Sequence, residues 1–202
     1  MKLNIKNIVI LISVAIIGLI GVQIVWINNA IEVRKSQFDQ EVRASLIVVS
    51  QQIPKVIKQN QEAKLFQIQK QMKSGGADFN TLMDAMLDNN PFKRFSDKIS
   101  KEQLDSLIKK EMLRRGINTS YVFGVFDYSR NVLYEEDTNS QNYTELVTEG
   151  INIPVYLDDF MLTQTFISII FPKKNNFIFK KMWLILSISF LLILAVVYAF
   201  YF

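Results

Sequence analysis

The side chain best suited to binding a small charged ligand in this 202-residue chain is Arg130. It is the only base in residues 116–172, where it stands among eight acids. A guanidinium in an acidic stretch suits an anionic or carboxylate ligand, because its N–H donors form a fixed fork that matches two carboxylate oxygens. A solvated arginine at a turn is the alternative interpretation of the same residue.

A second candidate for chemistry is the acidic run Glu135, Glu136 and Asp137. Its oxygens could help to bind a divalent cation, but a solvated acidic turn has the same composition. The chain contains no histidine and no cysteine, which excludes a histidine base, a thiol nucleophile and imidazole or thiolate zinc ligands. We therefore expect binding rather than catalysis, with no metal site and no cofactor.

The charged residues are distributed unevenly. All 19 acids and 21 of the 23 bases lie in residues 28–181, and the net charge of the whole chain is only +4. No basic stripe interleaved with aromatic residues is present. We therefore do not expect this chain to bind nucleic acid.

Residues 8–27 form the first of two uncharged segments. Twenty helical residues span about 30 Å, the thickness of the hydrocarbon core of a membrane. A cleaved signal peptide is the alternative, because Lys2 and Lys6 precede the segment. The apolar run is longer than a signal peptide needs and no small-residue cleavage site follows. We predict an uncleaved transmembrane helix after a cytoplasmic tail of residues 1–7.

The second uncharged segment is 182–202, which Lys180 and Lys181 precede. We predict a second transmembrane helix. The bases at the amino terminus favour a cytoplasmic location for that end. The lysines beside the second segment would favour a cytoplasmic location for residues 28–181 instead. Long translocated domains follow the charge rule poorly. We therefore expect both ends inside and residues 28–181 outside.

Residues 28–115 are predicted to be helical. No glycine or proline interrupts residues 22–53, so the first transmembrane helix should continue into this region. Pro54 should kink or break it, and a second stretch should end at Ser74–Gly76. We expect a short helix over 78–87. One apolar stripe follows the helical repeat at Ile31, Phe38, Val42, Leu46, Val49 and Ile53.

A further helix is expected between Ser100, as N-cap with Gln103 in the capping-box position, and Gly116. Residues 116–172 are predicted to form a small antiparallel sheet, which makes the fold class α+β. The expected elements are a hairpin of strands 121–127 and 132–136, a polar loop over 137–150, a short strand at 155–158 and a long strand at 161–171. Residues 28–115 carry a net +5 and residues 116–172 a net −7, so a basic helical layer should pack on an acidic sheet.

This layout resembles the sensory half of bacterial membrane-bound histidine kinases. Residues 121–134, YVFGVFDYSRNVLY, are similar to the central hairpin of their extracytoplasmic PAS-like folds. Residues 166–172 and 177–183 are similar to their last strand and the entry to the second span. The resemblance implies a bacterial inner-membrane location with a periplasmic central domain. Members of the family continue into a histidine-bearing kinase core, so this chain resembles the input part and should have no kinase activity.

In PAS-like sensors the ligand pocket lies between the sheet and its covering loops and helices. The resemblance therefore implies a ligand site, for a small molecule or a protein that the sequence does not identify. The matching residues are Tyr121, Phe123, Arg130, Tyr134 and Tyr143.

The implied function is a signal-sensing input module of a two-component system, which transmits an external stimulus through its transmembrane helices. Two subunits packed along the Ile31–Val49 stripe would form a homodimer, and Gln23 is a candidate for a hydrogen bond between membrane helices. The alternative is a structural or assembly membrane protein whose outer domain binds a partner protein.

Overall fold

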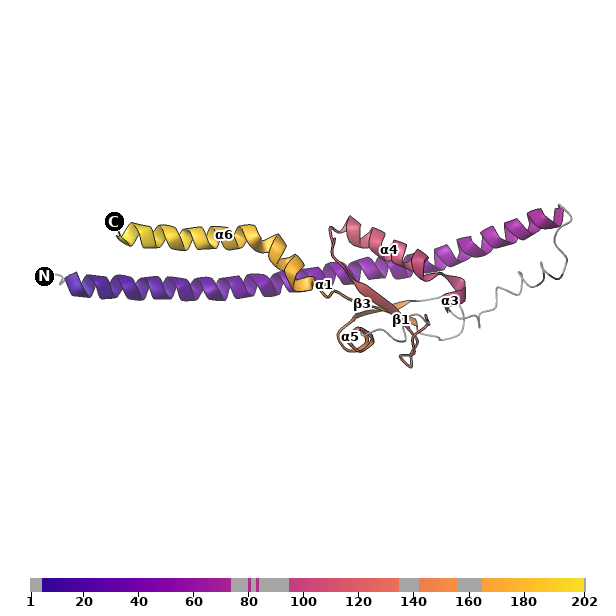
Figure 1. Cartoon of the computed structure of the whole chain (residues 1–202), viewed down its shortest axis with the longest axis horizontal. Helices are drawn as coiled ribbons and strands as arrows, with labels where there is room; N and C mark the ends of the chain where they lie inside the picture. Colours follow the sequence, from indigo (N-terminus) through magenta and orange to yellow (C-terminus); the bar gives the residue numbers. More distant parts are fainter. Residues whose placement is uncertain are drawn as a thin grey trace. The chain divides into compact units, whose positions relative to one another are not determined.

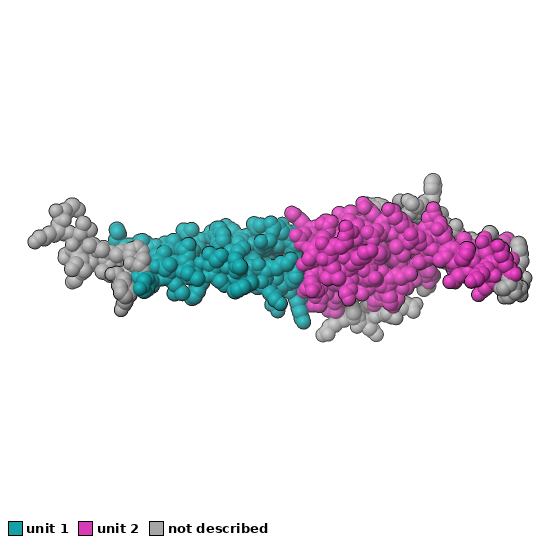
Figure 2. All heavy atoms as spheres, turned by 90° about the horizontal axis from the view of Figure 1, so that it is seen from above, with its two compact units in different colours: residues 1–39, 173–202 teal, residues 40–172 magenta. Residues whose placement is uncertain are grey.

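The structure is a computed structural model that describes residues 5–73, 80, 83, 95–134, 142–155 and 165–201. The chain divides into two compact units (Figure 2). Unit 1 comprises residues 1–39 and 173–202, and unit 2 comprises residues 40–172.

Unit 1 contains the first part of helix α1 (Ile5–Lys73) and helix α6 (Lys174–Tyr201) (Figure 1). Both helices are long and apolar enough to cross a membrane, and their most apolar windows have mean hydropathies of 1.9 and 2.2. These windows are 0% and 6% buried, so neither is the core helix of a globular domain. On α1, the Oε1 atom of Gln23 is buried and has no hydrogen-bond partner among the described residues.

Helix α1 is one helix of 69 residues, which confirms that the first apolar segment continues into residues 28–53. The prediction that Pro54 could break the helix is wrong, because Pro54 lies inside α1. Proline removes one backbone hydrogen bond and costs about 3 kcal/mol in a helix interior. Its neighbours Ile53 and Ile57 are 0% and 8% exposed, and burial of such side chains offsets that cost on both sides of the proline.

Unit 2 contains the rest of α1 and, among the described residues, six shorter elements. These are α3 (Phe95–Lys98), α4 (Lys101–Arg114), β1 (Val122–Phe126), α5 (Tyr143–Thr148), β2 (Ile151–Val155) and β3 (Thr165–Ile170). The strands form one antiparallel sheet in the order β1-β3-β2, with β3 in the centre. The predicted helix at 78–87 falls almost wholly outside the described residues.

The ends of α4 are fixed by local sequence as predicted. Ser100 accepts from the Gln103 amide while the Gln103 side chain accepts from the Ser100 amide, which completes a capping box. At the other end Gly116 has φ 70°, a left-handed conformation that glycine adopts without strain. The amides of Gly116 and Ile117 donate to the carbonyls of Leu113 and Met112, the pattern of a Schellman motif.

The sheet has two faces. One face carries Phe123 and Val125 of β1, paired with Ile169 and Ile167 of β3. This face points toward the helices, as shown by Tyr121, two residues before Phe123, whose hydroxyl donates to Asp105 of α4. We call it the inner face. The other, the outer face, carries Phe126 and Ile170, which form a small core with Leu146 of α5.

The predicted strands were partly misplaced. Among the described residues, the return strand of the hairpin consists of a single bridge between Phe126 and Val132, and the main partner of β1 is β3. The loop prediction for 137–150 is wrong at its end, where α5 forms. Strand β2 covers 151–155, and of the strand predicted at 155–158 only Val155 lies within the described residues. Strand β3 covers 165–170 of the predicted 161–171.

Part of the apolar stripe of α1 is buried within the single chain. Val42, Leu46, Val49 and Ile53 are all 0% exposed, so these four side chains form part of the core of unit 2. Ile31 and Phe38 of the same stripe belong to unit 1, and a homodimer packed along Ile31–Val49 stays a prediction.

Candidate functional site

A hollow of about 260 Å³ lies over the outer face of the sheet, entirely within unit 2. The strands contribute Phe126, Phe166 and Asn152, and α5 contributes Val147. The turn that follows β1 supplies the remaining lining residues, which are Asp127, Tyr128 and Arg130. Ordinary ligand pockets measure about 300–1,000 Å³, so this hollow suits a small molecule.

The turn at the rim of the hollow is fixed by its own hydrogen bonds. The Arg130 amide donates to the Asp127 carbonyl at 3.0 Å, and the Asp127 amide donates to the Asn131 carbonyl at 3.0 Å. Both carboxylate oxygens of Asp127 accept from Asn131, at 2.8 Å and 2.9 Å. Arg130 has φ 63°, so this is a three-residue loop that ends in a left-handed residue.

Helix α5 can sit on the sheet because two glycines admit it. A Cβ on Gly124 would lie 2.9 Å from the Phe126 ring, and a Cβ on Gly150 would collide with the Leu146 carbonyl and the Ser168 hydroxyl. The Ser168 hydroxyl donates to that carbonyl at 2.6 Å. This close approach of α5 to β3 forms one wall of the hollow.

Two of the five predicted ligand residues meet at this hollow. The Tyr143 hydroxyl donates to the Arg130 carbonyl at 3.1 Å, and the Tyr143 ring packs 6.0 Å from the Phe126 ring. Arg130 itself is exposed and lines the hollow. Tyr143 thus holds the backbone of the residue that presents the guanidinium.

The other predicted residues lie away from it. Phe123 is 8% exposed on the inner face. Tyr121 donates its hydroxyl to Asp105 Oδ1 at 2.7 Å, and burial together with this bond raises the pKa of Tyr121 above its usual value. Tyr134 donates to the Ile99 carbonyl at 3.0 Å and its ring meets Phe95 edge-on. These three side chains stabilise the packing of sheet on helices.

Sequence reasoning missed Asn152, Phe166 and Tyr128 as lining residues. Phe166 lies on the same face of β3 as Ile170, because residues four positions apart in a strand share a face, and this is the outer face. Asn152 pairs with Ser168 across β2 and β3, a register that joins residues far apart in the sequence. The signal for Phe166 was present, whereas that for Asn152 required the sheet order.

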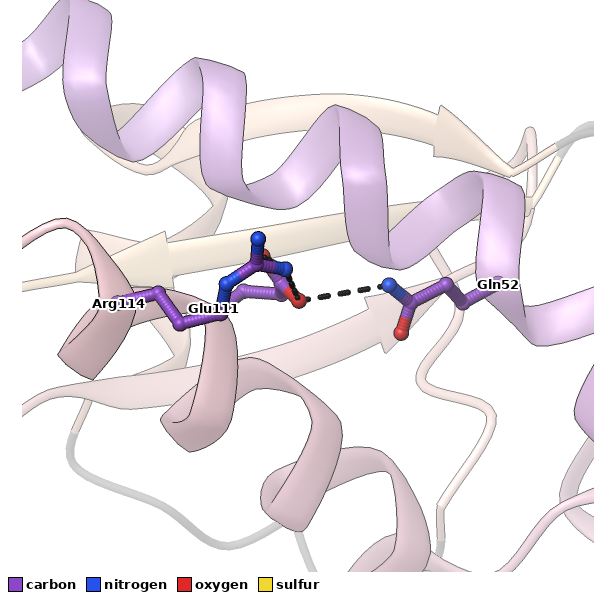
Figure 3. A network of polar contacts seen from close by, with 3 residues as sticks. All are labelled: Gln52, Glu111 and Arg114. Atoms are coloured by element: carbon purple, nitrogen blue, oxygen red, sulfur yellow. Dashed lines mark hydrogen bonds and ion pairs between the residues drawn. The ribbon is translucent and has the colours of Figure 1, made fainter.

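A buried carboxylate joins α1 to α4 on the other side of unit 2 (Figure 3). Glu111 is 3% exposed; its Oε1 accepts from Gln52 at 3.4 Å and from Arg114 at 3.0 Å. Arg114 is 66% exposed along its side chain, so solvent reaches the positive partner. The cluster fixes the position of α4 along α1, and its three residues do not line the hollow on the outer face.

Unit 1 contains a polar contact between α1 and α6 at the ends of their apolar windows. Lys174 Nζ lies 2.7 Å from Asp39 Oδ1 and 5.7 Å from the centre of the Phe38 ring. The Phe38 ring is 5.6 Å from that of Phe177, over which Lys181 lies at 4.8 Å. We call these five residues the clasp, because they hold the start of α6 against α1.

Among the residues that the structure describes, no group of three or more acids could hold a metal ion. The acidic run 135–137 lies outside those residues. The chain matches no family model, no curated protein and no solved structure. The functional argument rests on the residues and the geometry given above.

Proposed function

We propose that this chain is the membrane-anchored input module of a bacterial two-component sensor histidine kinase, with unit 2 outside the inner membrane. The observation that carries the proposal is the continuity of α1. One helix contains both an exposed apolar window and the buried stripe from Val42 to Ile57 that forms the core of unit 2. A change in the packing of that core acts directly on a helix that enters the membrane.

A second connection supports the same mechanism. The central strand β3 ends at Ile170 and α6 begins at Lys174, so only a short segment separates the sheet from the second apolar helix. A stimulus shifts such a system between two packings only by as much as its affinities for the two differ. The clasp sets the resting position of α6 on α1.

The membrane topology can be tested without background because the chain contains no cysteine. Lys2→Cys, Lys58→Cys and a cysteine appended after Phe202 are each treated with a membrane-impermeant maleimide in intact bacteria. We expect only Lys58→Cys to react, and the other two to react after permeabilisation. Reaction of either end in intact cells would contradict the proposed orientation.

Signal transmission is tested by joining residues 1–202 in helical register to the kinase core of a characterised sensor. One alanine inserted after Asn29 advances α1 by 1.5 Å and rotates it by about 100°, and we expect altered autophosphorylation. Seven inserted residues nearly restore the helical face and should restore much of the output. Identical output from all three proteins would refute transmission through α1.

An assembly role remains the second candidate, favoured by Phe66, which is 69% exposed on α1. A large exposed aromatic side chain is a typical anchor for a protein partner. That role predicts that Phe66→Ser abolishes recovery of a partner from cross-linked cells, whereas the kinase fusions show no dependence on insertions in α1.

A further inference from the structure

We propose that the hollow on the outer face binds a small monocarboxylate with a flat apolar body, through the Arg130 guanidinium. This proposal deepens the sensory function above and rests on it for its biological meaning. The binding itself is argued from the backbone, the charges and the lining of the hollow.

The backbone of Arg130 is unusual for its residue type. Its φ of 63° is left-handed, a conformation in which a Cβ is crowded and which glycine or asparagine usually fills. The chain nevertheless places an arginine there, and two hydrogen bonds hold its N–H and its carbonyl. Strained positions that their surroundings enforce concentrate at binding sites.

The guanidinium of Arg130 has no carboxylate partner within the described part of the chain. Asp127 is the nearest acid in sequence, and Asn131 occupies its two oxygens. Since a guanidinium binds a carboxylate through two parallel hydrogen bonds, an external carboxylate fits Arg130. Asn152, exposed on β2 and lining the same hollow, supplies an amide donor beside it.

The lining also specifies the body of the ligand. Phe126 and Phe166 contribute rings from neighbouring strands, and Tyr128, 77% exposed, contributes a third from the turn. Aromatic rings favour offset or edge-on contact with a flat apolar group. The volume of about 260 Å³ limits this group to a compact one.

The charge of the ligand is limited by the acids around it. Arg130 is the only base in residues 116–172, whose net charge is −7. Asp127 lies at the rim and Glu145 and Glu149 lie on or beside α5, the helix that walls the hollow. Arg130 is the only base among the described residues that line the hollow, so a second or third negative charge on the ligand would meet repulsion from these acids and a monoanion fits best.

The test uses the full chain in lipid nanodiscs and benzoate as the probe, with benzamide as its neutral analogue and citrate as a polyanion. Calorimetric titration should show saturable benzoate binding. Benzamide should bind at least about tenfold more weakly because it lacks the charge-assisted hydrogen bonds to Arg130, and citrate should bind at least about tenfold more weakly because its further negative charges meet the acids beside the hollow. Equal affinity for benzoate and benzamide, or tighter binding of citrate, would overturn the proposal.

Arg130→Gly separates binding from folding, because glycine accepts the left-handed backbone without strain. We expect this variant to melt at or above the wild-type temperature and to lose benzoate affinity at least about tenfold. Arg43→Ala removes an exposed arginine of α1 that does not line the hollow and should bind normally. Unchanged binding by Arg130→Gly would refute the site.

The two proposals fail in different ways. Absence of saturable benzoate binding overturns the monocarboxylate site and leaves the cysteine-labelling result unaffected. Labelling of the chain ends from outside overturns the proposed membrane topology and leaves benzoate binding to unit 2 unaffected.

Discussion

Replacing Leu46 by alanine tests whether the apolar stripe of α1 is the core of unit 2. Leu46 is 0% exposed, and its helical neighbours Val42 and Val49 are also 0% exposed. Truncation of a fully buried leucine costs about 2–5 kcal/mol, because the lost transfer free energy adds to that of the cavity left behind. Ile47, the next residue, is 44% exposed, and Ile47→Ala should change the unfolding free energy by less than about 1 kcal/mol.

The measurement is the urea concentration at which unit 2 is half unfolded, and pulse proteolysis of the full chain in mild detergent reports the folded fraction. With a urea dependence of about 2 kcal/mol per molar, Leu46→Ala should lower the midpoint by about 1–2.5 M. Leu46→Val, a smaller truncation, provides a measurable midpoint where the alanine variant is too unstable. The matched Ile47→Ala variant should remain close to wild type.

The dependence of the Leu46→Ala effect on protein concentration distinguishes a core residue from a residue at a dimer seam. A core residue destabilises the chain equally at all protein concentrations, whereas a residue at a seam between two copies does so less as the protein is diluted. Equal, small effects of Leu46→Ala and Ile47→Ala would contradict burial of the stripe. A Leu46→Ala effect that disappears on tenfold dilution would instead place Leu46 at a seam between two copies of the chain.

Three further changes have defined outcomes. Tyr121→Phe should cost about 1 kcal/mol at neutral pH through the lost bond to Asp105. Burial is the larger cause and this bond the second cause that raises the pKa of Tyr121 in the folded chain, so wild-type stability should fall as pH rises above about 10. Urea titrations from pH 8 to 11 should show that Tyr121→Phe lacks this pH dependence. Parallel pH profiles of the two proteins would contradict this. Gly150→Ala should lower the melting temperature and the free energy of unfolding, the latter by more than about 2 kcal/mol, because the added Cβ would meet the Leu146 carbonyl. Gly18→Ala is the control: nothing lies within 4 Å of the added Cβ, so this variant should melt as wild type. Ser100→Ala removes the acceptor of the capping box and should cost about 1 kcal/mol in urea unfolding; an unchanged midpoint would show that the start of α4 is held by tertiary packing alone.

Part of the candidate site could be predicted from residue types alone. Arg130 is a lone base in an acidic stretch, and the structure places it at the rim of a hollow. Tyr121 and Phe123 were grouped with it through the resemblance to PAS-like sensors. Successive residues of a strand point to opposite faces, so Tyr121 and Phe123, two positions apart, share one face, and assigning them to the site needed knowledge of which face carries the hollow.

The sequence by itself determined the features that depend on a few neighbouring residues. It determined two apolar helices, the continuity of the first helix beyond the membrane segment, the capping box at Ser100 and the glycine end at Gly116. These follow from helical periodicity and from hydrogen bonds between residues three to five positions apart, which any chain with this local sequence can form.

Only the tertiary structure decided which strands pair and where the hollow lies. Val122 of β1 pairs with Ile170 of the distant strand β3, and Pro54 stays inside α1. Both outcomes are favoured by the apolar area buried when distant segments meet, which no local sequence signal specifies. The hollow at Arg130 exists because α5 packs on the outer face beside Gly124 and Gly150.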